Sequence, residues 1–171
     1  KEQEIKQFKW TIEAVANLKV RLKQSQQLGT RLETVVTEWG KAQKVRYTKT
    51  AKGDKTVLVL TYAAKQTVHG KKSVTLWFEQ EKDQGYRFTM VDATNLLYAN
   101  EKASSEKEIT TEKENKGTEL ARLINKLGTP QRLVWGELLD GEEGFLATYQ
   151  IPGQAEVVME LKKKGKKLVL I

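Results

Sequence analysis

Two stretches of this chain, each 17 residues long, share one design although they begin 88 residues apart. The first, GTRLETVVTEWGKAQKV, begins at Gly29, and the second, GTELARLINKLGTPQRL, begins at Gly117. Gly, Thr, Leu, Gly and Gln stand at matching places, whereas unrelated windows of this length share about one identity. We therefore expect a tandem repeat in which each copy supplies one structural unit.

Each stretch predicts a helix with a marked beginning and end. Thr30 followed by Glu33 forms a T-x-x-E capping box, in which the side chains bond free amide groups at the helix start. Gly40 accepts the left-handed conformation that ends a helix. In the second copy Thr118 caps the helix and Gly128 ends it. The predicted buried faces are Leu32, Val35, Val36 and Trp39, and Leu120, Leu123, Ile124 and Leu127.

A longer helix is predicted ahead of the first stretch, over residues 3–23. Its apolar residues recur at spacings of three, four and seven, which is typical of a helical stripe. The stripe consists of Ile5, Phe8, Ile12, Val15 and Leu22. Trp10, Leu18 and Val20 fall outside it, so we expect this helix to pack on two sides.

After each repeated helix the apolar residues alternate, which is typical of strands. The expected strands cover residues 44–50, 56–63, 73–80 and 86–92, and then 131–138, 144–151, 155–162 and 166–171. The short connections with glycine favour antiparallel hairpins. We therefore expect an α+β fold of two tandem repeats, 1–92 and 117–171, each a helical layer packed on a four-stranded antiparallel β-meander. The polar residues 93–116 between them predict a linker, with room for a short helix at 92–98.

The positive charge of the chain is concentrated in its first half. Residues 1–93 contain 18 Lys and Arg against 10 Asp and Glu, and residues 94–171 contain 12 of each. A basic half favours nucleic acid, anionic lipid or an anionic wall polymer as partner, but it is equally typical of a well-solvated lysine-rich surface. The chain has no cysteine, which excludes disulfides and zinc–thiolate sites. No apolar run approaches the roughly 18 residues of a membrane-spanning helix.

The residue pattern indicates no catalytic or metal-binding constellation. His69, the only histidine, lies in an expected hairpin loop without a nearby nucleophile or carboxylate to act with. The spacings HExxH, CxxC and paired histidines are absent. Glu137, Asp140, Glu142 and Glu143 could loosely attract calcium, but their spacing differs from that of a calcium loop, and turn formation explains them. We expect no enzyme, no cofactor and no metal ion.

The motifs resemble a known superfamily. A helix that ends in an L-G-x-P type of turn, followed by a meander with a tyrosine and a V-x-L-x-F strand, is similar to the repeats of the β-lactamase inhibitor protein and of small outer-membrane-assembly lipoproteins. The nearest similarity is to uncharacterised lipoprotein-like domains exported by Gram-positive bacteria. The residues that carry it are Gly29, Thr30, Leu32, Val35, Gly40, Tyr62 and Phe78, and Gly117, Thr118, Leu120, Gly128, Pro130 and Tyr149.

This resemblance implies helices on one face of each sheet, an opposite face open to partners, export from the cell, and binding without catalysis. The sequence departs from the family pattern at two points, the turn after the first repeated helix and the lipid anchor. Lys41 and Ala42 stand where the family has Lys-Pro, and no lipid-attachment cysteine occurs. A lipid anchor would therefore belong to a segment outside this chain.

The strands hold the candidate binding residues. In the third strand Thr75 and Trp77 share the face opposite Val74, Leu76 and Phe78, because strand side chains alternate. In the fourth strand Arg87 and Thr89 oppose Tyr86, Phe88 and Met90. If the more apolar face meets the helices, the partner-binding candidates are Trp77, Arg87, Thr75, Thr89 and, on the first strand, Arg46. Alternatively, Trp77 covers a neighbouring strand, and the stretch VLVLTY at 57–62, apolar on both faces, leaves the choice of face open.

From these features we expect a non-enzymatic binding protein of the cell envelope or the exterior, whose open sheet face recognises a protein partner. The alternative is a polyanion-binding module, in which the basic first half binds nucleic acid or an anionic wall polymer. Steep loss of affinity with salt would distinguish the second from the first. No feature of the sequence indicates an oligomeric state.

Overall fold

The computed structural model describes residues 8–64, 72–97, 105–153 and 155–171. The predicted loop with His69 and the first residues of the predicted helix 3–23 therefore lie outside the described residues. The helices are α2 (Ile12–Ala16), α3 (Leu32–Trp39), η1 (Thr94–Leu96), α4 (Glu106–Lys113) and α5 (Leu120–Leu127). The strands are β1 (Lys44–Lys49), β2 (Thr56–Ala63), β3 (Ser73–Glu81), β4 (Gly85–Asp92), β5 (Arg132–Glu137), β6 (Glu143–Gln150), β7 (Glu156–Lys164) and β8 (Lys167–Leu170).

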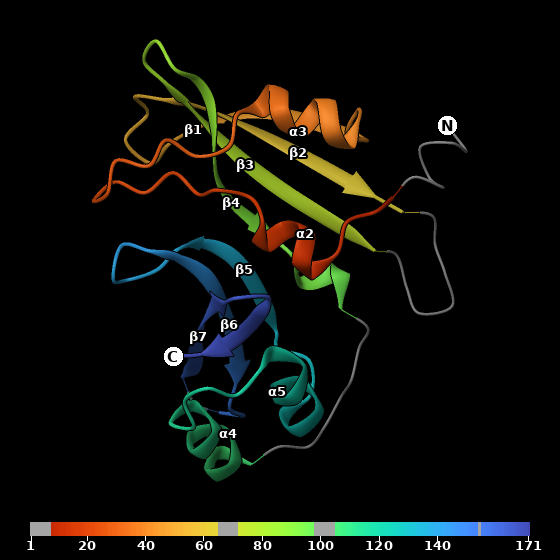
Figure 1. Cartoon of the computed structure of the whole chain (residues 1–171), viewed down its shortest axis with the longest axis vertical. Helices are drawn as coiled ribbons and strands as arrows, with labels where there is room; N and C mark the ends of the chain where they lie inside the picture. The colour runs from red at the N-terminus through yellow and green to blue at the C-terminus, as the bar shows by residue number, and fades with distance from the viewer. Residues whose placement is uncertain (1–7, 65–71, 98–104, 154) are drawn as a thin grey trace.

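The strands form one antiparallel sheet of eight strands, in the order β1 to β8. Figure 1 shows β1–β4 in its upper half and β5–β8 in its lower half. The prediction of two tandem repeats, each a separate four-stranded meander under its own helical layer, is therefore wrong, and the helices are few and short. Each strand nevertheless lies within two residues of its predicted range. Alternation locates single strands but does not say that β4 and β5 will pair across the predicted boundary.

The ladder between the two halves of the sheet is short. Only two residue pairs, Val91 with Trp135 and Asp92 with Val134, join β4 to β5. Just beyond them the amide of Ala93 donates to the Leu133 carbonyl at 2.8 Å. By comparison, β5 and β6 share six pairs. The strands alone thus connect the two halves weakly.

The residues between α2 and α3 are extended rather than helical. The predicted helix over 3–23 is wrong for most of its described part, because only Ile12–Ala16 forms a helix there. Leu18, Val20 and Leu22 are all buried, and residues at every second position share a side of an extended chain, not of a helix. Leu18 and Val20, which fell outside the predicted stripe, therefore fill the core together with Val15 and Leu22 of the stripe.

Residues 18–30, here called the clamp segment, close the outer edge of β4. The amide of Arg21 donates to the carbonyl of Phe88 at 2.9 Å, and the amide of Phe88 donates to the carbonyl of Thr30 at 2.9 Å. The clamp segment folds back on itself between these points, where Thr30 donates to the Lys19 carbonyl at 2.9 Å. Backbone groups of β4 that β5 does not reach are thereby satisfied.

The same clamp segment binds the second half of the sheet. The indole N–H of Trp135 donates to the Leu18 carbonyl at 2.9 Å in the buried core. One carboxylate oxygen of Glu143 accepts from the Val20 amide at 2.9 Å and from the side chain of Gln27 at 3.0 Å. The clamp segment is therefore hydrogen-bonded to β4, β5 and β6 at once.

The two repeated helices end as predicted but begin differently. Gly40 and Gly128 follow α3 and α5 with positive φ angles of 80° and 89°, which confirms the predicted helix ends. The predicted capping box at Thr30 and the predicted cap at Thr118 are wrong, since neither helix has a side-chain cap. The Thr30 hydroxyl accepts instead from the Lys19 amide at 2.9 Å, and the Thr118 hydroxyl donates to the Asn115 carbonyl at 2.9 Å. Both threonines stabilise the preceding segment rather than the helix.

A helix also forms within the predicted polar linker. Ser105 caps α4 by accepting from the amide of Glu108 at 3.2 Å. Ile109 is buried in the main core cluster, and Glu112 accepts from the Lys126 side chain of α5 at 3.0 Å, so both residues attach this otherwise polar helix. At the other end of the linker the short helix expected at 92–98 is present as η1.

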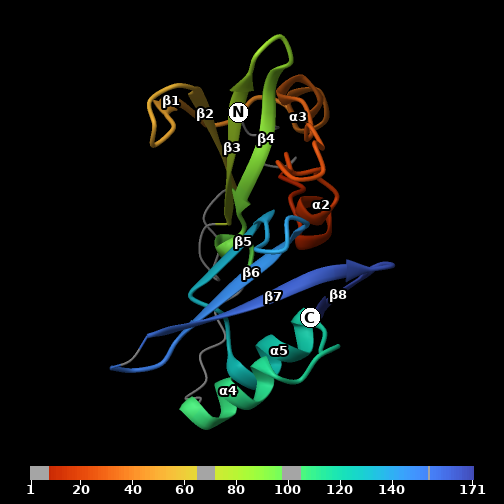
Figure 2. The same cartoon turned by 90° about the vertical axis from the view of Figure 1, so that its left-hand side faces the viewer.

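The core lies on one face of the sheet. Figure 2 shows α2 and α3 on one side of the upper strands, with α4 and α5 beside β7 and β8. The buried apolar residues of all four helices belong to one cluster with those of the strands. The strand members of that cluster include Leu58, Leu60, Leu76, Phe78, Phe88, Val91, Leu133, Trp135, Phe145, Ala147, Met159 and Leu161. We call this the core face and the opposite one the open face.

Two tyrosines fasten the helix ends to the core face. The Tyr62 hydroxyl donates to the Gly40 carbonyl at 2.7 Å, and the Tyr149 hydroxyl donates to the Gly128 carbonyl at 2.8 Å. Burial raises the pKa of Tyr62 to about 12 and also raises the pKa of Tyr149 above its usual value, because a phenolate would lose its hydration.

These raised pKa values predict a loss of stability in alkali. An unfolded tyrosine ionises near pH 10, so the unfolded chain releases protons that the folded chain still holds. The stabilising contribution is complete below about pH 10 and disappears as the pH rises through about 12. Urea midpoints measured across this range should fall less steeply for Tyr149→Phe than for the wild type. Tyr47→Phe, at an exposed tyrosine of β1, is the control and should keep the wild-type slope.

The clamp segment predicts a difference between two glycines with similar backbone angles. Gly29 and Gly53 have φ angles of 89° and 72°. A Cβ at Gly29 would lie 2.7 Å from the Phe88 carbonyl oxygen and 2.8 Å from the Arg21 nitrogen, whereas a Cβ at Gly53 meets nothing within 4 Å. Gly53→Ala should lower the free energy of unfolding by about 1 kcal/mol. Gly29→Ala should lower it by about 3 kcal/mol, measured by urea unfolding, because it separates the clamp segment from β4. Equal losses would contradict this role of the clamp segment.

Candidate functional site

The open face presents a continuous row of side chains across the sheet. Residues paired in register, Arg46 with Val59, Val59 with Trp77 and Trp77 with Met90, carry it over β1–β4. In the second half the same face continues in the adjacent row, where Val134 pairs with Asp92 of β4 and with Leu146 of β6. The row lies opposite the core face, and none of its members belongs to the core cluster. It is therefore a surface formed by both halves of the sheet.

Trp77 lies at the centre of the first half of this row and is half-buried. Its neighbour Val59 is only 2% exposed, although the core cluster on the other face does not include it. We attribute the burial of Val59 to the flanking side chains of Trp77 and Arg46, its two partners in register. The register favours the alternative in which the Trp77 ring covers a neighbouring strand, and its partly exposed surface leaves the binding role a prediction.

A β-bulge changes which residues of β4 reach the open face. Trp77 pairs with Met90, but the next residue, Phe78, pairs with Phe88, so Thr89 is an extra residue. The Thr89 hydroxyl donates to the Trp77 carbonyl at 3.2 Å. The strict alternation expected for β4 placed Met90 on the core side, and it lies instead opposite Trp77 on the open face.

Arg87, another of the predicted binding residues, uses its side chain for hydrogen bonds within the protein. Its side chain is almost fully buried, with the residue 6% exposed. Its Nε donates to the Gln84 carbonyl at 2.9 Å, and its Nη1 donates to the Gly29 carbonyl at 3.1 Å. Arg87 thus fastens the β3–β4 turn to the clamp segment. The predicted residues that the structure places on the open face are Arg46, Thr75, Trp77 and Thr89. The hydroxyl oxygens of Thr75 and Thr61 are 3.4 Å apart.

A groove of about 540 Å³ crosses the open face where the two halves meet. Its apolar lining comes from Met90, Val134, Leu146 and Val158. Its polar lining comes from Arg21, Lys23, Glu79, Thr89, Arg132, Glu137, Thr148 and Glu156. Apart from Thr89, none of these residues was predicted as a binding residue, because the groove exists only once β4 and β5 pair.

A glycine keeps the groove open at the joint. A Cβ at Gly136 would lie 3.3 Å from the Cβ of Met90, on the opposite half of the sheet. Its register partner Gly144 does not line the groove, because the Leu138 side chain fills the space beside it. The absent side chain at Gly136 therefore leaves the groove open beside Met90.

The two sides of the groove differ in charge. Arg21 donates from Nη1 to Glu81 at 2.6 Å and from Nη2 to Glu79 at 2.8 Å, so this side is neutralised internally. On the other side Arg132 and Glu156 are exposed and form no ion pair with any other described residue. The groove therefore offers both signs of charge around an apolar floor.

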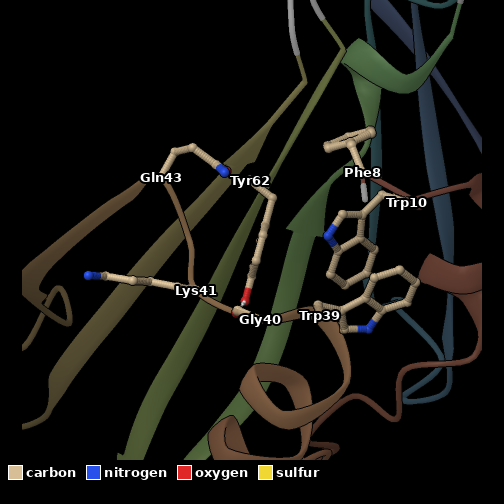
Figure 3. Close-up of a pocket in the computed structure, with 7 residues that line it drawn as sticks. All are labelled: Phe8, Trp10, Trp39, Gly40, Lys41, Gln43 and Tyr62. Atoms are coloured by element: carbon tan, nitrogen blue, oxygen red, sulfur yellow. Dashed lines mark hydrogen bonds between the residues drawn. The ribbon is translucent and has the colours of Figure 1, made fainter. Parts of the chain in front are cut away.

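A second, small pocket of about 50 Å³ lies on the core side, beside the end of α3. Figure 3 shows the rings of Trp10 and Trp39 stacked beside it and Tyr62 reaching toward Gly40. The two indole centroids are 4.0 Å apart. A space of this size holds a few water molecules and is too small for an organic ligand. We assign this aromatic cluster to the attachment of residues 8–10 rather than to binding.

Two further findings concern metals and membranes. Within the described ranges, no three residues among His, Cys, Asp and Glu are grouped so that they could hold a metal ion. The described helices are all too short or too polar to cross a membrane.

Comparison with known proteins yields one structural likeness. No family model matches the chain, and no curated protein matches it. The chain is similar to a solved structure from Streptococcus mutans described as a "putative beta-lactamase inhibitor protein", over 91% of this chain and 89% of that chain, with 18% identity and a TM-score of 0.44. A likeness at this level carries no conclusion about the family, partner or function of this chain. The resemblance seen in the sequence, to the inhibitor-like repeats as well as to Gram-positive lipoprotein domains, stays a prediction.

The charged side of the groove predicts unequal effects for two neighbouring cations. Arg21 bonds two carboxylates and its side chain is 11% exposed, whereas Lys19 lies 3.6 Å from Glu143 and its side chain is 63% exposed. Arg21→Gln should lower the free energy of unfolding by roughly 2 kcal/mol, because two partly buried carboxylates lose their partner. Lys19→Gln should change it by less than about 0.5 kcal/mol. If the two variants lost similar free energies of unfolding in urea, the structural role assigned to the Arg21 ion pairs would be contradicted.

Proposed function

We propose that this chain is a non-enzymatic binding protein that holds a protein partner on the open face of its sheet. The observation that carries the proposal is the apolar floor of the groove, formed by Met90, Val134, Leu146 and Val158 on four neighbouring strands. The core cluster lies on the other face, so the partly exposed parts of these side chains remain available to a partner.

The chemistry of the groove suits a protein surface. Protein interfaces combine an apolar centre with a polar rim, and partners bury the centre while charged groups pair at the edge. Here Arg132 and Glu156 flank the apolar floor with opposite charges. A polyanion would leave the floor unused and would be repelled by Glu156 and Glu137. The groove therefore favours a protein over a polyanion.

Rigid strands also favour binding. Met90, Val134 and Leu146 project from paired strands, so little backbone freedom remains to be lost when a partner binds. Trp77 stands beside Met90 in register and adds an aromatic side chain to the same surface. Tryptophan is among the residues most often responsible for binding energy at interfaces. We include Arg46, Thr75 and Thr89 in this surface and leave out Arg87, whose donors serve the fold.

We also propose that the protein is exported to the cell envelope or the exterior and carries a lipid anchor on an upstream segment. This part of the proposal rests on the sequence resemblance alone. The check is the reading frame ahead of Lys1, where a signal sequence is expected. A continuous cytosolic domain encoded there would contradict export without touching the binding proposal.

Polyanion binding is the second candidate, and the exposed basic strand β1 favours it. All six residues of β1 are exposed, among them Lys44, Arg46 and Lys49. Polyanion binding would depend steeply on salt, since each phosphate contact releases counterions. Protein binding on an apolar floor would change little with salt.

The groove predicts which substitutions abolish partner capture. The immobilised chain should retain a discrete protein from envelope and culture-fluid fractions at both low and high salt. Trp77→Ala and Leu146→Ala should each weaken the interaction with the captured protein about tenfold or more, once its dissociation constant is measured. Val36→Ala, which truncates an exposed valine on α3 away from the open face, is the matched control and should bind as the wild type does.

The result has two contrary outcomes. Capture that is equal in Trp77→Ala, Leu146→Ala and wild type would place binding elsewhere and refute the open-face proposal. Capture of nucleic acid or wall polymer that disappears at high salt would establish the polyanion alternative instead. Circular dichroism of each variant shows whether a lost interaction reflects a lost fold.

A further inference from the structure

Strand β1 is unlike the other strands of the sheet, because it is paired on one side and exposed on both faces. It pairs with β2 over six residues, from Lys44 to Lys49, yet each of these residues is exposed. Figure 2 shows β1 at the outer edge of the upper half. Val45 and Tyr47 are 54% and 67% exposed on the core-side face, beyond the reach of the helices.

The other edges are covered by nearby segments of the chain. The clamp segment closes β4, as described above. At the opposite end of the sheet, the Gly117 amide donates to the Leu170 carbonyl at 2.7 Å, and the Leu170 amide donates to the Thr118 carbonyl at 2.8 Å. Among the described residues, none forms such backbone bonds with the outer side of β1. The fold therefore leaves this edge available for another strand.

The hydrogen-bond alternation identifies which backbone groups point outward. The Thr50 amide donates to the Lys55 carbonyl at 3.0 Å across the turn that joins β1 to β2. Because antiparallel strands alternate bonded and non-bonded pairs, Thr48 and Arg46 bond inward to β2. The amide and carbonyl groups of Val45, Tyr47 and Lys49 then face the outer edge.

The side chains of β1 define what an added strand would carry. On the open-face side lie Lys44, Arg46 and Thr48, and on the core side lie Val45 and Tyr47, with Lys49 at the end of the strand. Residues 41–53 contain five Lys and Arg and no Asp or Glu. Within the described part of the chain, Lys49 is the one β1 cation whose side chain bonds a neighbour, from Nζ to the uncharged Thr56 hydroxyl at 3.1 Å. An extended segment with acidic side chains on one face and apolar ones on the other matches both faces of β1.

We propose that the outer edge of β1 binds an extended segment of a partner protein, in which acidic and apolar residues alternate, as an added strand of the sheet. The backbone groups of Val45, Tyr47 and Lys49 pair with the added strand, as in other cases of strand addition. Lys44 and Arg46 pair with its acidic side chains, and Tyr47 contacts its apolar ones. This binding uses the edge of the sheet and does not depend on the open-face function proposed above.

A second copy of this chain is a poor occupant of the same edge. Two β1 strands placed side by side would bring Lys44, Arg46 and Lys49 of both copies together, and like charges across strands destabilise pairing. Lysine on an edge strand is also a common means by which proteins prevent self-association. The same charges that oppose a second copy favour an acidic strand.

The test compares two labelled peptides on the complete chain by fluorescence anisotropy. One peptide alternates glutamate with valine and phenylalanine, and the other has the same composition in scrambled order. The alternating peptide should bind at least about tenfold more tightly, because only its order matches both faces of β1. This comparison needs no variant and so does not depend on whether a variant folds.

Three substitutions then locate the site. Tyr47→Pro removes an outward amide while leaving the inward ladder to β2 intact, and should weaken binding of the alternating peptide about tenfold. Arg46→Glu should weaken it by a similar factor through charge. Lys52→Glu makes the same charge change in the exposed turn beyond β1 and should alter binding about twofold at most. Trp77→Ala should leave this binding unchanged, which separates it from the open-face function.

Hydrogen exchange gives a second readout of the same complex. The amides of Val45 and Tyr47 should exchange more slowly when the alternating peptide is bound, because they become donors in a ladder. If neither peptide binds, the edge of β1 is not a binding site and the proposal is overturned. If both peptides and inorganic polyphosphate bind equally well, with no effect of Tyr47→Pro, the proposal is overturned in favour of a simple anion-binding site. Dimerisation of the chain that Tyr47→Pro abolishes would overturn it in favour of a second copy.

Discussion

The backbone bonds of the clamp segment hold the two halves of this sheet in one arrangement. The β4–β5 ladder has only two residue pairs, and so short a ladder would allow one half to rotate against the other. The clamp segment adds bonds from Arg21 and Thr30 to Phe88 on one half, and from Leu18 to Trp135 on the other. Because an extended segment with bonds to both halves resists rotation, the groove between them keeps one shape.

The site and the fold share their residues at this joint. Arg21 bonds to Phe88 through its backbone and to Glu79 and Glu81 through its side chain, so one residue closes β4 and forms a side of the groove. Glu143 likewise accepts two bonds from the clamp segment close to the end of the groove. Substitutions here change stability and groove shape together. Residues such as Leu146, which only line the floor, allow binding to be tested separately from stability.

The local pattern of the sequence predicted the strands and the helix ends, because alternation and left-handed glycine act over a few residues. It did not predict the pairing of β4 with β5 or the role of Leu18, Val20 and Leu22, since both depend on partners more than 40 residues away in the chain. The bulge at Thr89 was also missed, because the extra residue does not visibly interrupt the alternation of apolar and polar residues in the sequence. Consequently Trp77 could be placed on the candidate site from the sequence, whereas the groove beside it could not.

The distribution of charge gives the two candidate surfaces different selectivities. The groove contains both signs of charge and an apolar floor, so its specificity rests on shape and on the placement of Arg132 and Glu156. The edge of β1 is uniformly basic, so its specificity rests on charge and on backbone pairing. The two surfaces meet at Arg46, whose side chain lies on the open face beside Val59, while the backbone of its neighbours faces the edge. An acidic strand bound at the edge would neutralise Arg46 at the rim of the open face, two strands away from Trp77, so it would change the charge of that rim without contacting the Trp77 side chain.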